Sequence, residues 1–248
     1  METTSSFALL TYNINDDAMS DSAPRGWTLE TQHAALRQLV LQHNPDLLCL
    51  QECFGFPSRQ VFRSLQEQYT FHGDAPSHRG NCWIATRKDS QLQSDGPARK
   101  VGPCVLLPLR LGARRLVAGS CHLAPFAEFG PVRARQVSAI VSEVPPDSPL
   151  LLAGDTNMRE KETSLAGELG LRDAWLEAGS PPGARWTWDT HVNRYYQDGH
   201  RYTARYDRIL YRGSTVTELA VAANTPASRE PEHFLSDHFA LTARVTLH

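Results

Sequence analysis

The amino-acid sequence predicts an α/β fold in which two stacked β-sheets are flanked by helices. Three observations support this prediction. Short apolar segments of strand length recur along the chain, longer amphipathic segments lie between some of them, and 41% of the 248 residues are hydrophobic. A chain of this length can bury a large core, and no repeat, low-complexity tract or linker divides it. We therefore expect a single domain over residues 1–248.

The expected strands are apolar runs, and several of them are continuous instead of alternating. A continuous apolar run indicates a strand that is covered on both faces, as in a sheet packed between a second sheet and a layer of helices. The predicted strands cover residues 7–14, 46–52, 81–88, 104–111, 115–123, 149–155, 205–213, 216–224 and 239–248.

Two segments between these strands have the ends of helices. Residues 28–44 begin with Thr28, a residue type that caps helix N-termini, and they stop before a proline. Residues 131–144 begin with Pro131, which is favoured in a first helical turn, and they stop before a pair of prolines. We expect both segments to lie on the outside of the sheets.

Charge and cysteine content narrow the classes of function. The formal net charge is -2, so affinity for nucleic acid would require a local basic patch. The five cysteines form no C-x-x-C pair, which is typical of a reduced compartment. The sequence contains no run of 18 apolar residues, and it indicates neither a signal peptide nor a membrane span. We expect a monomer without membrane contact inside the cell, nuclear in a eukaryote and cytoplasmic otherwise.

Polar side chains suited to chemistry follow the apolar runs where the predicted strands end or begin. A single Asp or Asn at such a place is usually a turn former, so the argument rests on the whole set. Loops that follow parallel strands gather at one edge of an α/β sheet, and we expect these side chains to meet there. In chain order the set is Asn13, Glu52, His122, Asp155, Asn157, Asp207, Asp237 and His238.

This ordered set resembles the endonuclease/exonuclease/phosphatase superfamily, which includes deoxyribonuclease I, abasic-site endonucleases, neutral sphingomyelinases and inositol polyphosphate phosphatases. The likeness runs from "TYNI" to "SDHFAL" and is greatest to the tyrosyl-DNA phosphodiesterase 2 group, in the stretches "AGDTNMRE", "WTWDT" and "RYDRILYR". The resemblance implies one catalytic domain with a deoxyribonuclease I-like four-layer α/β sandwich and a site at one end of two mixed sheets. The chain departs from that group at Tyr12, where the group has Trp, and at Ala124 and Pro125, which replace polar residues.

Hydrolysis of a phosphodiester requires a Lewis acid, a positioned nucleophile and partners for the charge of the transition state. Oxygen ligands and few carboxylates favour Mg²⁺, for which Mn²⁺ is a substitute. We assign Glu52 as the direct metal ligand. Asn13 would hold a nearby oxygen or water, and Asp237 would be an outer partner of the metal.

The resemblance also implies roles for the remaining polar residues. Asp155 would orient and deprotonate the attacking water, and Asn157 would fix that water or a phosphate oxygen. His238, oriented and kept charged by Asp207, would stabilise negative charge in the transition state. His122 would bind another phosphate oxygen. An alternative stays open at this point, because the C-terminal histidine of this superfamily has also been assigned as the base.

Residues 185–212 contain six Arg, three Asp and seven aromatic residues, a local formal charge of six minus three, or +3. Cationic and aromatic side chains together are typical of surfaces that bind single-stranded nucleic acid. Equally, some of these aromatic residues belong to the core, as we expect for Tyr211. The predicted substrate contacts are Arg159, Trp188, Arg205 and Tyr206, with Arg133 and Arg135 as further candidates.

Three functions remain open on the sequence. The first is a Mg²⁺-dependent phosphodiesterase that hydrolyses 5′-phosphotyrosyl-DNA linkages and so removes trapped topoisomerase adducts during DNA repair. The second is another hydrolase of the superfamily, either a DNA or RNA nuclease or an enzyme acting on inositol phosphates or sphingomyelin. The third is a non-catalytic binding module of the same fold, which predicts losses at the key positions. None of the eight polar residues is replaced.

Overall fold

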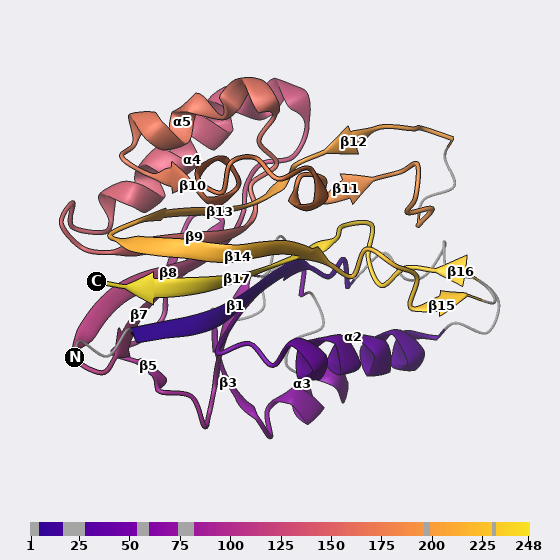
Figure 1. Cartoon of the computed structure of the whole chain (residues 1–248), viewed down its shortest axis with the longest axis horizontal. Coiled ribbons are helices and arrows are strands. Elements are labelled where there is room, and N and C mark those ends of the chain that lie inside the picture. Colours follow the sequence, from indigo (N-terminus) through magenta and orange to yellow (C-terminus); the bar gives the residue numbers. More distant parts are fainter. Residues whose placement is uncertain (1–4, 17–27, 54–59, 74–81, 196–198, 230–231) are drawn as a thin grey trace.

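The computed structural model shows how these segments fold. It describes residues 5–16, 28–53, 60–73, 82–195, 199–229 and 232–248. Two stacked β-sheets form the centre of the molecule, with helices on both outer sides (Figure 1). Among the described residues, no helix is long and apolar enough to span a membrane.

The first sheet has six strands and is mixed, because β1 and β2 are parallel while its other neighbouring strands are antiparallel. Its spatial order is β14 (Ser214–Ala222), β17 (Ala240–Leu247), β1 (Ser5–Asn13), β2 (Leu47–Gln51), β4 (Trp83–Arg87) and β3 (Tyr69–Gly73).

The second sheet has seven strands and is also mixed, with β8 and β9 as its parallel pair. Its spatial order is β10 (Arg172–Asp173), β13 (Asp207–Arg212), β9 (Leu150–Asp155), β8 (Arg114–His122), β7 (Cys104–Leu111) and β5 (Leu92–Ser94), and β6 (Arg99–Val101) pairs with β7.

Helices cover the outer face of each sheet and complete the four layers that the resemblance implies. α2 (Leu29–His43) and α3 (Gln60–Leu65) lie on the first sheet, whereas α4 (Gly130–Ser142) and α5 (Ser164–Glu168) lie on the second (Figure 1). The short α6 (Ala174–Glu177) contacts β13 and β14, and its Ala174 belongs to the core between the sheets. Thr28 caps α2, since its side chain accepts a hydrogen bond from the amide of Thr31. The predicted fold class is therefore confirmed.

Three apolar clusters hold the layers together. Between the sheets, side chains such as Leu9 and Ile209 form a buried core. Leu36 of α2 packs on the outer face of the first sheet, and Ile140 of α4 packs on that of the second. Strands buried on both faces explain the continuous apolar runs in the sequence.

All of the predicted strands and both predicted helices are present, each with ends within two residues of the expected positions. The sequence did not indicate β3, β5, β6 or α3, which are short and have mixed polarity, so tertiary neighbours decide their conformation. Further short elements are β11 (Trp188–Asp189), β12 (Thr203–Ala204), β15 (Ser228–Arg229), β16 (Glu232–His233) and the 3₁₀ turns η1 (Ala127–Phe129), η2 (Glu160–Glu162) and η3 (Pro182–Ala184).

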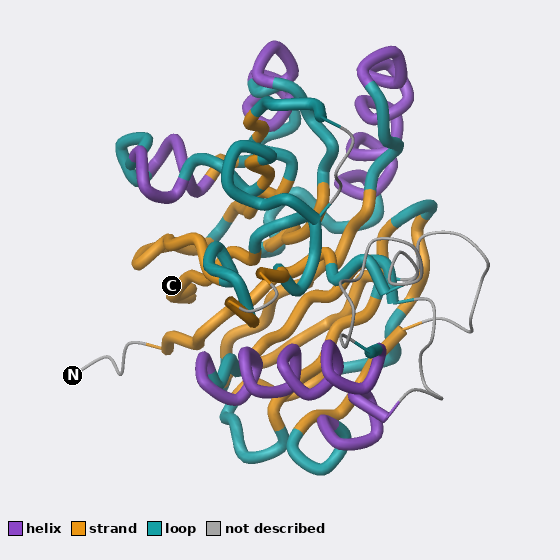
Figure 2. The backbone as a smooth tube through the Cα atoms, turned by 90° about the vertical axis from the view of Figure 1, so that its right-hand side faces the viewer, coloured by secondary structure: helices purple, strands orange, loops and turns teal. Residues whose placement is uncertain are grey.

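The topology brings one edge of both sheets to the same end of the molecule, which faces the viewer in Figure 2. The parallel strands β1, β2, β8 and β9 all end there, and the register pairs His122 with Asp155. The antiparallel strand β13 begins there, with Asp207 opposite Asp155. The site therefore combines the ends of four strands with the beginnings of two others, β13 and β17.

Candidate active site

Asn13 connects the two sheets at this edge. Its side-chain amide donates to Oε1 of Glu52 over 2.9 Å and to Oδ2 of Asp155 over 3.1 Å. Its Oδ1 accepts from the backbone amide of Asn15 over 3.1 Å, and the side chain is fully buried. Asn13 thus holds two carboxylates close together from strands in different sheets.

Glu52 comes directly after β2 and has a φ of 55°, a left-handed conformation that non-glycine residues rarely adopt. Burial raises the pKa of Glu52 above its usual value, although His122 and the hydrogen bond from Asn13 oppose this shift. A partly buried carboxylate without a bound cation is costly, so this environment favours a positive ligand.

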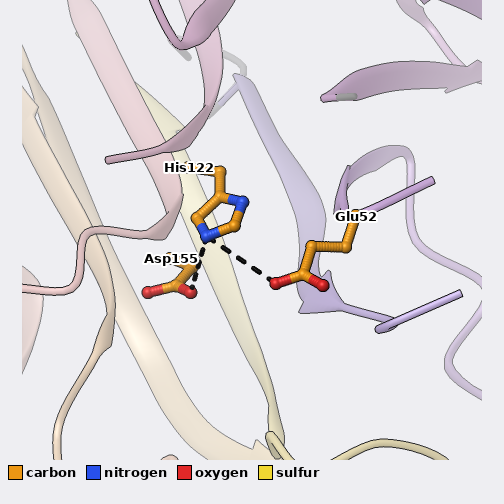
Figure 3. Close-up of side chains that lie close together, drawn as sticks. All are labelled: Glu52, His122 and Asp155. Atoms are coloured by element: carbon orange, nitrogen blue, oxygen red, sulfur yellow. Dashed lines mark ion pairs between the residues drawn. The ribbon is translucent and has the colours of Figure 1, made fainter. Parts of the chain in front are cut away.

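Glu52, His122 and Asp155 form a compact group of potential metal ligands (Figure 3). Nε2 of His122 lies 3.4 Å from Oδ2 of Asp155 and 3.7 Å from Oε1 of Glu52. The ligand atoms all lie within 4.8 Å of one another. The residues therefore fit a metal ion, and their two carboxylates match the oxygen preference of hard divalent cations.

The loop after β9 positions Asp155 and Asn157. Oδ1 of Asp155 accepts from the backbone amide of Asn157 over 2.9 Å, and the side-chain amide of Asn157 donates to the carbonyl of Leu123 over 3.1 Å. Gly154 has a φ of 146°, and a Cβ atom there would lie 2.2 Å from the carbonyl oxygen of Cys121. Only glycine lets β9 approach β8 this closely.

His238 and Asp207 form a buried pair, with 2.8 Å between Nδ1 and Oδ2. Nε2 of His238 lies 3.7 Å from Oδ2 of Asp155. Burial alone would lower the pKa of His238, but Asp207 and Asp155 raise it well above its usual value. The imidazole is therefore held in its charged form and donates from Nδ1 to Asp207.

Asp237 is held by residues that the sequence analysis missed. Its Oδ1 accepts from the side-chain amide of Asn15 over 2.9 Å and lies 3.1 Å from Oγ of Ser236. Ser236 also donates to the carbonyl of Asn13 over 2.7 Å. The second asparagine of the Asn-Ile-Asn sequence at the end of β1 was the available signal for Asn15. Its side chain holds Asp237 in place at the predicted site.

Aromatic side chains pack beside this polar group. Trp188 lies edge-on to His238, with 5.0 Å between ring centroids, and Tyr206 is tilted against the same ring at 6.2 Å. Tyr202 stacks on Trp188 at 6.0 Å. The guanidinium of Arg159 lies 4.6 Å from the ring centre of Tyr206. We call Trp188, Tyr202 and Tyr206 the aromatic wall.

Two predicted substrate contacts need correction. Arg205 is 3% exposed, its Nη1 donates to both carboxylate oxygens of Asp173, at 2.9 Å and 2.7 Å, and its guanidinium lies 4.7 Å from the ring centre of Trp175, so its charge is paired inside the protein. Arg133 is fully buried against Glu162. Tyr211 is a core residue, as expected. Residues 196–198 of the basic and aromatic segment lie outside the described residues.

The sequence profile of the endonuclease/exonuclease/phosphatase family matches residues 10–238, a range that includes all eight predicted polar residues. The chain belongs to this family. The first curated relatives are longer than this chain, which spans 63% of the length of a Caenorhabditis elegans protein and 39% of that of a Mus musculus protein.

These family members are named for one reaction. The Caenorhabditis elegans protein, a 5′-tyrosyl-DNA phosphodiesterase, is 26% identical over 88% of this chain. The Mus musculus protein, tyrosyl-DNA phosphodiesterase 2, is 33% identical over 55% of it. The truncated Caenorhabditis elegans tyrosyl-DNA phosphodiesterase 2 structure has a TM-score of 0.79 at 25% identity and covers 97% of this chain and 98% of that chain. A Danio rerio structure with a single-strand DNA product has a TM-score of 0.79, covers 97% of this chain and 99% of that chain, and at 19% identity shows the shared fold.

Proposed function

We propose that the chain is a Mg²⁺-dependent phosphodiesterase that hydrolyses the linkage between a tyrosine and the 5′ phosphate of DNA. The observation that supports this most strongly is the juxtaposition of the polar group and the aromatic wall. Trp188 and Tyr206 pack directly on His238, which lies 3.7 Å from Asp155. A phosphate bound at the polar group therefore has a base-stacking surface beside it.

Glu52 is the proposed direct ligand of the metal, next to Asp155, with Asn13 fixing both carboxylates. Asp237, which is held by Asn15, is the proposed outer partner of the metal, and its negative charge acts on Glu52. When bound there, Mg²⁺ supplies Lewis-acid polarisation of the phosphate, and Mn²⁺ shares its preference for oxygen ligands.

Asp155 is the proposed base that orients the attacking water, and Asn157 holds this water or a phosphate oxygen. Hydrogen bonds to the backbone fix both side chains before substrate binds. The charged imidazole of His238 stabilises the negative charge that develops on the phosphate oxygens, and His122 binds a further phosphate oxygen. Preorganised charge of this kind costs no reorganisation during the reaction.

A tyrosyl leaving group suits this set of side chains. A phenol has a pKa of about 10, so it departs without a dedicated strong acid. The DNA strand lies along the aromatic wall, where Arg159 provides a positive charge and the rings provide stacking surfaces. Aromatic rings and guanidinium groups favour nucleic acid over a lipid substrate.

One assay tests this proposal against the other superfamily activities. A 5′-phosphotyrosyl single strand, an abasic duplex, an unmodified strand and an inositol phosphate are offered side by side with Mg²⁺. We expect turnover of the first substrate, and we expect Asp155→Asn and His238→Ala to abolish it while the protein stays folded. Preference for another substrate, or retained turnover in either variant, would overturn the proposal.

A further inference from the structure

The loop that follows His122 presents two aromatic side chains to solvent. Phe126 is 61% exposed and Phe129 is 39% exposed, and their ring centroids lie 6.3 Å apart. We call this pair the phenylalanine platform. Large apolar side chains that lie exposed next to each other mark surfaces that contact a ligand or partner.

The buried side chain of Arg133 fixes the backbone of the platform. Phe126 has a φ of 65°, which is unfavourable for a residue with a side chain. Nη1 of the buried Arg133 donates to the carbonyls of Ala124 and Phe126 over 2.8 Å and 2.6 Å. Nε and Nη2 of Arg133 donate to the two carboxylate oxygens of Glu162 over 2.8 Å and 2.7 Å. A strained loop fixed in this way is preorganised for binding.

Other hydrogen bonds connect the start of this loop to the phosphate site. The backbone amide of Leu123 donates to the carbonyl of Asp155 over 2.9 Å, and Asn157 donates to the carbonyl of Leu123. Sheet order places the platform, which follows β8, on one side of β9 and the aromatic wall, which precedes β13, on the other. A phosphodiester bound near Asp155 carries two substituents, which we call the nucleotide arm and the tyrosyl arm. Each of them has an aromatic surface on its own side of β9.

The two surfaces differ in charge. The aromatic wall carries Arg159 over Tyr206. Between residues 123 and 132, in contrast, the only charged residue is the acidic Glu128. A strand of phosphates is repelled by a carboxylate, whereas a peptide with apolar and cationic side chains is not. The nucleotide arm therefore belongs on the wall, and the other arm belongs on the platform.

An apolar groove continues this second surface. It lies between α4 and the turn that joins β6 to β7, and its lining includes one cation, Arg135, beside Val101, Gly102, Pro103, Val132, Gln136 and Ala139. Val132 follows Phe129 by three residues on the same side of a helical turn. The carbonyl of Pro103 accepts from the backbone amide of His122 over 3.1 Å, so the groove also begins at the site.

We propose that Phe126 and Phe129 bind the peptide residues attached to the tyrosine of the substrate, the arm that leaves after hydrolysis. This inference rests on the proposed function and adds a recognition surface for the protein part of the adduct. The occupant is a peptide with a cationic side chain beside Glu128 and apolar side chains toward the groove beside α4, where Arg135 disfavours further positive charge.

Two substrates with the same nucleotide arm test the inference. One is a single strand carrying a 5′-phosphotyrosyl peptide of apolar and basic residues, and the other is the same strand with a 5′-(4-nitrophenyl) phosphate. We expect the double variant Phe126→Ala, Phe129→Ala to lower kcat/KM for the peptide substrate about tenfold, mainly through KM. For the nitrophenyl substrate we expect a change of less than about twofold, because no peptide is present.

Matched variants exclude general effects. Leu176→Ala removes another exposed apolar side chain, on α6, and should leave both substrates unaffected. Phe126→Trp keeps an aromatic surface and should retain the peptide preference. The two single phenylalanine variants replace the double variant if that protein does not fold. Equal losses on both substrates, or no loss on the peptide substrate, would overturn the inference alone. No turnover of either substrate by the unaltered protein would overturn the proposed function as well.

Discussion

Nδ1 of His238 lies 2.8 Å from Oδ2 of Asp207, and both side chains are buried at the edge where the two sheets meet. Burial would make the imidazole neutral, yet the neighbouring carboxylates Asp207 and Asp155 raise the pKa of His238 well above its usual value. The pair therefore keeps a positive charge at a buried position, where its effect on a phosphate is large.

Asp207→Asn tests whether this charge contributes to turnover. The variant removes the main group that raises the pKa of His238 while the burial remains, so the pKa should fall. A histidine is charged below its pKa, and activity that needs the charge is lost as pH rises through it. We expect the alkaline limb of the kcat/KM profile to move to lower pH and the activity at about pH 8 to fall about 10²- to 10³-fold.

A surface change serves as the control for this pH profile. Glu218→Gln removes an exposed carboxylate that pairs with Arg244 on the first sheet, and it should leave the profile unchanged. An alkaline limb that stays in place in Asp207→Asn would show that Asp207 does not act through the charge of His238.

The eight polar site residues could be predicted because each follows or precedes an apolar run, and strand ends of this fold share an edge. The contacts between the sheets could not. Gln51, for example, donates to Oγ of Ser120 over 2.9 Å, and this contact depends on how one sheet is placed on the other. No local pattern in the sequence encodes that placement.

The arginines show the same limit. Arg205 was predicted to contact substrate because it lies among aromatic residues, but its partner Asp173 is 32 residues away in the chain. The partner of Arg133, Glu162, is 29 residues away. Sequence composition registers the positive charge of such residues, whereas burial and pairing appear only when the distant acid is placed.

Glu52→Gln tests the metal site. Burial raises the pKa of Glu52, and a carboxylate binds metal only when it is deprotonated. Mg²⁺ affinity should therefore decrease by up to about tenfold per pH unit as pH falls through this raised pKa, which lies above the usual value. In Glu52→Gln the affinity should be at least about tenfold weaker, and its dependence on acid pH should be reduced. Isothermal titration calorimetry across the acid range measures both effects, and an unchanged affinity in the variant would remove Glu52 from the ligand set.

Gly154→Ala tests the close approach of β9 to β8. The new Cβ atom would lie 2.2 Å from the carbonyl oxygen of Cys121, and the φ of 146° is unfavourable for alanine. We expect the free energy of unfolding to fall by about 2–4 kcal/mol in urea titrations. Gly167→Ala is the matched control, because nothing lies within 4 Å of the added atom in α5, and it should be neutral or stabilising by up to about 1 kcal/mol. Similar stabilities of the two variants would contradict the packing argument.

Arg159→Ala tests whether the aromatic wall receives a nucleic-acid strand. The guanidinium of Arg159 lies 4.6 Å from the centre of the Tyr206 ring, beside the catalytic loop, where it can neutralise one phosphate. Its loss should weaken the binding of a single strand and reduce the slope of log K against log salt by about 0.7, the contribution of one single-strand phosphate. Arg115→Ala removes a cation whose side chain is 78% exposed at the opposite end of β8, and it should leave the slope unchanged. If the two variants change the slope equally, the strand is held by overall charge, and the wall is not its path.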